Sequence, residues 1–256
     1  MGKVIKFVAA GDNHGDHGDP NALAALKEFC KDFKPHERIH LGDCFDLRGW
    51  RKGSGSDSQE HNQSGKPDLQ EGFKMLSWYR PTVFLYGNHE DRITQAIINL
   101  ANAKERDLAE DVQDQIHSKL RSFGCRKIIK YHYDKGVHRI GPVAFIHGYA
   151  HGRNATTQQG IHYATPGGAL IHGHTHNLAS EALIKHGSGN AFSAGCLCDK
   201  SAMVYAKNRL ATARWGSGFV AGIIDGDDYK AWLIHKSGPS GKWVWPTNFK
   251  FFSTNA

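Results

Sequence analysis

Five short apolar runs, each followed by polar residues of the same few kinds, constrain this chain more than any other feature of its sequence. The runs are KVIKFVAA, RIHLGD, TVFLYGN, PVAFIHG and ALIHGHTH, and all of them end before residue 177. Segments of helical length separate them. One of these is 20–33, in which Leu23, Leu26, Cys30 and Phe33 recur at helical intervals. Alternating strands and helices predict an α/β fold with a largely parallel sheet.

The remaining chain is predicted to complete one domain spanning residues 1–256, because it contains neither an internal repeat nor a clear linker. Residues 72–79 and 92–123 read as helices, the second as one long helix. After His176 the pattern changes to short strands with Gly and Asn turns, which predicts a hairpin-rich second sheet. The polar, Gly- and Ser-rich stretch 48–72 is predicted to be a mobile loop or lid.

Composition narrows the functional classes. Hydrophobic residues make up 39% and charged residues 22%, as in a soluble protein, and no apolar run approaches the roughly 20 residues of a membrane span. The N-terminus reads as a first strand and not as a signal peptide. Five scattered cysteines predict reduced thiols in the cytoplasm of a bacterium or a phage-infected cell. Cys196 and Cys198 lack nearby partners at zinc spacing, so two buried strand cysteines are the expectation.

Charge and histidine content point toward anions and metals. The net charge of +7 tilts the expected partners toward polyanions such as nucleic acid, although many basic proteins bind none. The 17 histidines invite a search for metal ligands. The tryptophans after residue 214 suit the core or a contact between copies of the chain, so a homo-oligomer is compatible with the sequence.

The polar residues at the five strand ends are the candidate ligands. In chain order they are Asp12 and His14, Asp43 and Asp46, Asn88 and His89, His147, and His174 and His176. Asp-x-His and G-D-x-x-D are each also common turn sequences, and His147 alone reads as a core or surface histidine, whereas G-N-H-E and G-H-T-H are more specific. Because the carboxyl ends of parallel strands converge on one crevice, the five together predict a single site. Carboxylate and imidazole ligands suit Mn, Fe or Zn better than Mg or Ca.

The motifs D-x-H, G-D-x-x-D, G-N-H-E, H and G-H-x-H, in this order over about residues 5–180, resemble those of the calcineurin-like metallophosphoesterases. The segments GNAFSAGCLCD and WGSGF are similar to the small phage and prophage phosphoesterases. The resemblance implies a four-layer αββα sandwich of two mixed β-sheets flanked by helices. It also implies an enzyme, a metal-dependent phosphoric ester hydrolase.

The resemblance further implies a role for each motif residue. Asp12, His14 and His176 would hold one metal ion, Asn88, His147 and His174 a second, and Asp43 would bridge the two. The ions would be divalent transition metals, Mn²⁺ first, with Fe, Ni, Co or Zn as alternatives. Such a pair activates a hydroxide for attack on phosphorus. His89 would protonate the leaving alkoxide, and Asp46 would orient its imidazole.

Residues around the motifs carry weaker predictions. Arg92 and Arg48 are expected to bind the substrate phosphate, since guanidinium groups match its geometry, although Arg92 could instead face solvent. Glu90 is expected to brace a neighbouring loop or to cap the next helix. Strand alternation turns His40 and His172 away from the site, and neither they nor His151 are assigned a role.

The substrate is predicted from departures within the motifs. Protein phosphatases continue the second motif as G-D-x-x-D-R-G, whereas this chain has Leu47 at the arginine position and Arg48 one residue later. The two histidines around Thr175 resemble the phosphodiesterase and nuclease branches. A phosphodiester of a nucleotide or nucleic acid is therefore the predicted substrate. The alternatives are a monoesterase acting on a small phosphorylated substrate, a non-catalytic metal-binding scaffold, and a DNA-binding module with a vestigial site.

Overall fold

A computed structural model describes residues 4–51, 63–99, 102–184, 187, 189–203, 210–238 and 240–246. Its larger sheet has seven strands in the order β12-β11-β10-β1-β2-β3-β4. The strands are β1 (Ile5–Ala10), β2 (Glu37–His40), β3 (Val83–Leu85), β4 (Lys127–Ile129), β10 (Gly218–Asp225), β11 (Asp228–Ser237) and β12 (Lys242–Trp243). Strands β1 to β4 are parallel, whereas β10 pairs antiparallel with β1, with Ile5 opposite Ile224.

The second sheet has five strands in the order β5-β6-β7-β9-β8. They are β5 (His138–Ile140), β6 (Val143–Ile146), β7 (Ala169–His172), β8 (Leu178–Leu183) and β9 (Gly189–Ala194). The inner strands β6, β7 and β9 are parallel, and the edge strands β5 and β8 pair antiparallel with their neighbours. Both sheets are therefore mixed, as predicted.

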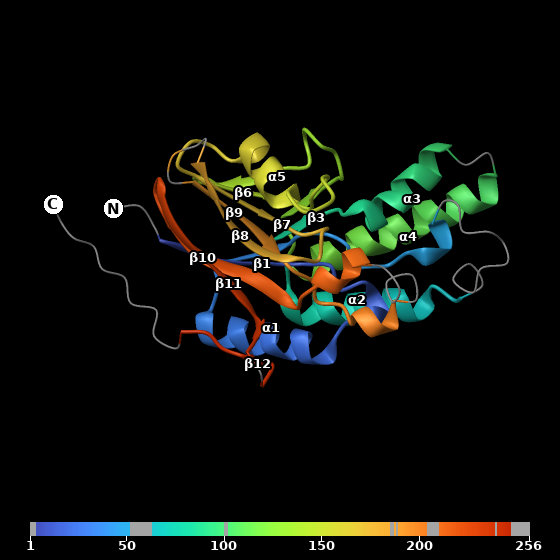
Figure 1. The fold of residues 1–256 in the computed structure, drawn as a ribbon. Coiled ribbons are helices and arrows are strands. Elements are labelled where there is room, and N and C mark those ends of the chain that lie inside the picture. The colour runs from blue at the N-terminus through green and yellow to red at the C-terminus, as the bar shows by residue number, and fades with distance from the viewer. Residues whose placement is uncertain are drawn as a thin grey trace.

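Helices cover the outer faces of the two sheets (Figure 1). They are α1 (Pro20–Phe33), α2 (Lys66–Tyr79), α3 (Asn88–Asn99), α4 (Ala103–Ser122) and α5 (Ala155–Tyr163). Short 3-10 helices lie at η1 (Gly15–His17), η2 (Arg48–Trp50), η4 (Lys200–Ala202) and η6 (Leu210–Arg214). The first four α-helices pack on the larger sheet, and α5 packs on β7, β8 and β9 of the smaller one.

Strand alternation builds the four layers. On β1, Phe7 faces the second sheet, where its ring meets that of Phe145 at a centroid distance of 5.2 Å. The next residue, Val8, faces the opposite way, into the core under α1 to α4. Because both faces of β1 are buried, its sequence is nearly continuously apolar. The predicted four-layer αββα sandwich is confirmed.

Three expectations about the elements differ from the structure. The predicted long helix is two helices, α3 and α4, and residues 100 and 101 between them lie outside the described part. The predicted loop 48–72 is partly ordered, since η2 covers 48–50 and α2 begins at Lys66, next to Pro67, which favours the first turn of a helix. Residues 52–62 of that loop are outside the described ranges.

The predicted second sheet is also different in detail. The late strands do not form a sheet of their own, because β8 and β9 join the smaller sheet while β10 to β12 extend the larger one beyond β1. Hairpin geometry alone does not say which exposed edge a hairpin will join. Within the described ranges, no helix is long and apolar enough to cross a membrane.

Candidate metal centre

The five predicted strand ends meet at one place, but they come from both sheets. Strands β1, β2 and β3 of the larger sheet and β6 and β7 of the smaller one all direct their carboxyl ends to it. The loop after β1 lies along the loop after β2, because the N–H of Asp12 donates to Gly42 O at 2.9 Å and the N–H of His14 donates to Asp43 O at 3.0 Å. The motif loops are therefore held in register by their own backbone.

The backbone of these loops is strained. Eight non-glycine residues of the described chain have a positive φ, and five of them are predicted metal ligands: Asp12, His14, Asp43, His174 and His176. Left-handed backbone is unfavourable for side chains with a Cβ and persists where the surroundings enforce it, often at functional sites. Both ends of the D-x-H motif, Asp12 and His14, belong to the same group of potential ligands, whereas Asn13 between them contacts His40.

Motif glycines make room for the two carboxylates. A Cβ at Gly87 would collide with Asp43 Oδ1, and a Cβ at Gly173 would collide with Asp12 Oδ2. Each glycine precedes a motif residue, so the close approach explains why glycine precedes the Asn88-His89 and His174-Thr175-His176 clusters.

Asp43 lies at the middle of the cluster, almost fully buried. Its Oδ2 is 3.4 Å from His147 Nε2, 3.7 Å from His89 Nε2 and 3.9 Å from His14 Nε2. Its Oδ1 accepts the backbone N–H of His89 at 2.9 Å. One carboxylate thus faces imidazoles from the β1, β3 and β6 loops.

The first group of candidate ligands is Asp12, His14, Asp43 and His176, all buried, with potential ligand atoms within 4.8 Å of one another. His14 Nε2 and His176 Nε2 face each other at 3.2 Å, and His176 Nε2 is 3.1 Å from Asp12 Oδ1. Facing imidazole nitrogens need a shared proton or a cation between them. A divalent ion satisfies these lone pairs together, so the donor set fits a metal.

The second group is formed by Asp43, His147 and His174, joined by the side chain of Asn88. Asn88 Oδ1 lies 2.8 Å from His174 Nδ1 and 3.0 Å from His147 Nε2. His147 Nδ1 donates to Leu41 O at 2.8 Å, which leaves Nε2 as the nitrogen directed at the cluster. Ligand histidines commonly donate their other N–H to a carbonyl in this way. Asp43 belongs to both groups.

His89 and Asp46 form a hydrogen-bonded pair beside Asp43. His89 Nδ1 donates to Asp46 O at 2.8 Å and lies 3.0 Å from Asp46 Oδ1. The same Oδ1 is 3.4 Å from His14 Nδ1. One carboxylate therefore holds the Nδ1 side of two imidazoles and leaves both Nε2 atoms facing Asp43.

The two predicted phosphate-binding arginines have different surroundings. Arg92 donates from Nη1 to Asp46 O at 2.7 Å and from Nη2 to His89 Nε2 at 3.0 Å, so it lies against the imidazole of His89. Arg48 is buried, and its guanidinium is engaged by Asp46, Asp16 and Gln63. Its donors are directed at protein groups, and phosphate binding by Arg48 stays a prediction.

Glu90 braces the second and third motif loops. Its buried carboxylate accepts four backbone N–H groups, from Asp43, Cys44, Phe45 and Gly87, at 2.8–3.1 Å. Burial, followed by the nearby charge of Asp43, raises the pKa of Glu90 to about 7. A cation that neutralises Asp43 therefore favours the ionised form of Glu90, which is the form that accepts all four bonds.

Electrostatics divide the histidines into two kinds. Burial, with the nearby His89, lowers the pKa of His14 to about 4, and burial, with His147, lowers that of His174 to about 3. Burial also opposes the charged forms of His147 and His176. Asp43 nevertheless raises the pKa of His147 to about 9, and Asp12 raises that of His176. His14 and His174 are thus neutral near pH 7, whereas His147 carries a proton that a metal ion must displace.

Sequence reasoning missed several neighbours of the cluster. His151, to which the sequence assigns no role, has its Nδ1 3.2 Å from His174 Nε2. The Trp215 ring lies 4.1 Å from the His176 ring, and Cys198 Sγ is 3.9 Å from His176 Nδ1. The two cysteines follow β9 instead of lying in it, and Cys198 does have histidine neighbours. The sequence indicated that these residues could lie near the candidate ligands only through their types, histidine, cysteine and tryptophan.

His40 and His172 are turned away from the cluster, as predicted. His40 contacts Asn13 Oδ1 at 3.0 Å, and His172 contacts Gly173 O at 2.7 Å and Thr156 Oγ1 at 3.1 Å. A cavity of about 330 Å³ opens above the metal groups, lined by His89 and His151 and by Arg214 and Trp215 from the C-terminal part.

Comparisons with known proteins give structural matches alone. No protein-family model matches the chain, and no curated protein matches it. Among solved structures, YfcE, a phosphoesterase from E. coli, is 14% identical, with a TM-score of 0.43 over 94% of this chain and 97% of that one. Vacuolar Protein Sorting 29 from Cryptosporidium parvum is 13% identical, with a TM-score of 0.46 over 94% and 95%.

A third solved structure covers a larger protein. This chain spans 54% of a 5′-nucleotidase precursor from Thermus thermophilus, with 91% of this chain covered, 10% identity and a TM-score of 0.41. Because these values are low, we take no function from any of the three structures.

Replacement of Glu90 by Gln tests whether its carboxylate stabilises the second and third motif loops. The amide keeps the shape but offers one acceptor oxygen, so two of the four N–H groups lose their partner. We expect the free energy of unfolding to fall by about 2–4 kcal/mol, measured by urea denaturation of the metal-free protein. The exposed Glu71→Gln variant is the control and should change it by less than about 0.5 kcal/mol. Equal effects of the two variants would contradict the bracing role.

Metal binding should strengthen as pH rises. His147 has a folded pKa of about 9, above its usual value of 6.5, so its contribution to metal-free stability is complete below about pH 6.5 and is lost as pH approaches 9. Metal binding requires the neutral ring, and raising the pH removes the competing proton. The rise in melting temperature caused by Mn²⁺ should therefore be larger at pH 8.5 than at pH 6.5. A shift independent of pH would contradict this account.

Proposed function

We propose that this chain is a dinuclear-metal phosphoesterase of the calcineurin-like superfamily, and that its preferred substrate is a phosphodiester of a nucleotide or nucleic acid. The observation that carries the proposal is the position of Asp43, whose carboxylate belongs to two adjacent groups of buried potential ligands. His89 stands beside the same carboxylate. Two cations sharing one carboxylate, with an acid–base residue at their edge, suit phosphoryl displacement.

In this proposal Asp12, His14 and His176 hold one ion, Asn88, His147 and His174 hold the other, and Asp43 binds both. Mn²⁺ is the first choice, and Fe, Ni, Co and Zn are also compatible with these donors. When bound, the ions would supply Lewis acidity toward the phosphate and lower the pKa of water.

The chain's own residues account for the proton transfer. Asp46 holds the N–H on Nδ1 of His89, and Arg92, which can only donate, contacts Nε2. A substrate phosphate oxygen offers Arg92 a better acceptor than an imidazole, so its binding frees Nε2. Once Nε2 is free it takes up a proton from solvent. As water adds to phosphorus and the bond to the leaving oxygen breaks, His89 gives that oxygen the Nε2 proton, while the proton lost by the attacking water passes to solvent.

Preference for a diester rests on the second motif. The arginine that follows G-D-x-x-D in protein phosphatases, where it grips a phosphomonoester, is replaced by Leu47, which is buried. The next residue, Arg48, is engaged by two carboxylates. A monoester therefore lacks its usual guanidinium partner from this loop, whereas a diester carries one charge fewer and needs it less. A monoesterase is the second candidate, and a non-catalytic scaffold is the third.

Hydrolysis of two synthetic esters tests the proposal. With Mn²⁺, bis-p-nitrophenyl phosphate should be hydrolysed with a higher kcat/KM than p-nitrophenyl phosphate. Replacement of His89 by Ala should lower kcat by about 10²- to 10⁴-fold on a dinucleotide, whose alkoxide leaving group needs the proton, and by much less on the p-nitrophenyl diester, whose phenolate leaves unprotonated. The exposed variant Lys74→Ala, on the outer face of α2, is the matched control and should keep wild-type rates.

Each outcome separates the candidates. A higher kcat/KM on the monoester would favour the monoesterase. If neither ester is hydrolysed by protein that elemental analysis shows to contain metal, the catalytic proposal is wrong and the scaffold is favoured.

A further inference from the structure

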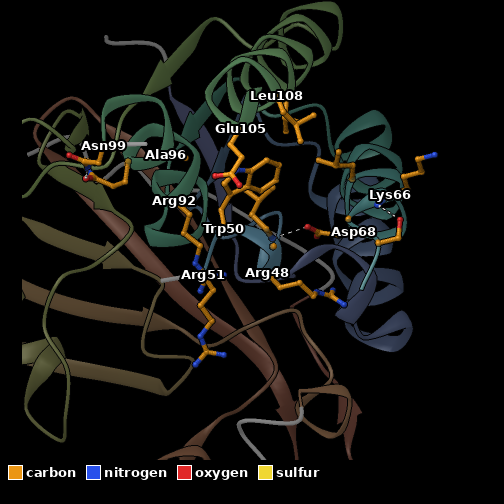
Figure 2. Close-up of a pocket in the computed structure, with 17 residues that line it drawn as sticks. Arg48, Trp50, Arg51, Lys66, Asp68, Arg92, Ala96, Asn99, Glu105 and Leu108 are labelled. Atoms are coloured by element: carbon orange, nitrogen blue, oxygen red, sulfur yellow. Dashed lines mark hydrogen bonds between the residues drawn. The ribbon is translucent and has the colours of Figure 1, made fainter. Parts of the chain in front are cut away.

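A second cavity, larger than the one over the metal groups, lies on the other side of Arg92. Its volume is about 720 Å³, within the roughly 300–1,000 Å³ range of small-molecule sites. It lies between η2, the start of α2, α3 and α4 (Figure 2). Neither the motifs nor the proposed metal centre accounts for it.

The cavity combines an apolar floor with a basic edge. Trp50 of η2 and Leu108 of α4 reach into it, beside Ala96 of α3 (Figure 2). Leu108 is 54% exposed, so this apolar side chain is accessible from the cavity that it lines. Arg51 and Arg92 line the same cavity, and their side chains extend toward one edge of it (Figure 2).

Arg92 connects this cavity to the reacting centre. Its side chain lines the cavity, while its guanidinium donates to Asp46 O and to His89 Nε2 at 3.0 Å. One side chain thus separates the cavity from the residue proposed to protonate the leaving group. A leaving group that takes a proton from His89 must lie on this side, so the rest of that group extends toward the cavity.

We propose, on the basis of the function proposed above, that this cavity binds the nucleoside released as the leaving group of a phosphodiester, with its base against Trp50 and Leu108. An aromatic ring and apolar side chains suit the flat face of a base, because stacking accepts any base. Gln95, Asn99 and Glu105 also line the cavity and offer hydrogen-bonding groups to base edges. Arg51 and Lys66 supply positive charge toward the phosphates of a longer strand.

A pair of substrates that differ in the leaving group alone tests this assignment. The deoxyadenosine dinucleotide and deoxyadenosine 3′-(methyl phosphate) give the same nucleotide on hydrolysis, but the first releases deoxyadenosine and the second releases methanol. With Mn²⁺, we expect the kcat/KM of the wild-type protein on the dinucleotide to exceed that on the methyl ester by about tenfold or more. Chromatography of the products measures both rates.

Two matched variants test whether the preference for the dinucleotide depends on the cavity. Leu108→Glu places a carboxylate in the cavity and should reduce the preference for the dinucleotide at least fivefold. Ile98→Glu makes the same change on α3, at a residue that is 68% exposed and does not line the cavity, and should retain the preference. Both positions are exposed, so both variants should fold, as equal melting temperatures would verify.

The outcomes distinguish this inference from the proposed function. Equal kcat/KM values for the two substrates, or a preference that Leu108→Glu does not alter, would overturn the assignment of the cavity. Hydrolysis of bis-p-nitrophenyl phosphate without hydrolysis of either nucleotide would also overturn it, while leaving the phosphoesterase proposal intact. If none of the three esters is hydrolysed, the proposed function itself is wrong.

Discussion

The carboxylate of Glu90 holds together the parts of the molecule on which the candidate site depends. Its four backbone hydrogen bonds tie the loop after β2 to the loop after β3, so that Asp43 and the start of α3 keep a fixed relation. This link adds to the direct hydrogen bond from the His89 N–H to Asp43 Oδ1 at 2.9 Å. A buried carboxylate with every acceptor position used is also a rigid one, and rigidity is what an array of closely spaced ligands requires.

Asp43 and Asp46 contact opposite sides of the imidazole rings. Asp43 faces Nε2 atoms from three loops, whereas Asp46 holds the Nδ1 side of His14 and His89. Burial raises the pKa of both carboxyls. The histidines outweigh it, so Asp43 and Asp46 have a pKa well below the usual range and are ionised at neutral pH. The cluster therefore presents negative charge inward, which favours a cation at its centre.

The alternation of strands and helices and the meeting of the strand ends were predicted from local patterns, whereas the four layers were implied by the resemblance to the metallophosphoesterases. Strand ends such as Asp12-Asn13-His14 are marked by an apolar run that stops at a polar group, and parallel strands bring such ends together. The edge that a hairpin joins depends on tertiary contacts, so the pairing of β10 with β1 could not be read from the β10–β11 hairpin. The same holds for His151 and Trp215, which reach the histidines through loops whose course no periodic pattern specifies.

For Arg48 and Leu108, the residue type alone did not predict the surroundings found in the structure. Phosphate binding by Arg48 stays a prediction, and the structure adds that its guanidinium, two residues from Asp46, pairs with that carboxylate. The cavity beside Arg92 arises from the spacing of η2, α3 and α4, and Leu108 gave no sign of it because an apolar residue on a helix normally indicates core.

Anomalous scattering from a crystal of the protein saturated with Mn²⁺ tests the central claim most directly. The account predicts two manganese peaks, both in contact with Asp43, one next to Asp12, His14 and His176 and the other next to Asn88, His147 and His174. A single peak, or peaks that do not share Asp43, would contradict the dinuclear centre on which the proposed function depends.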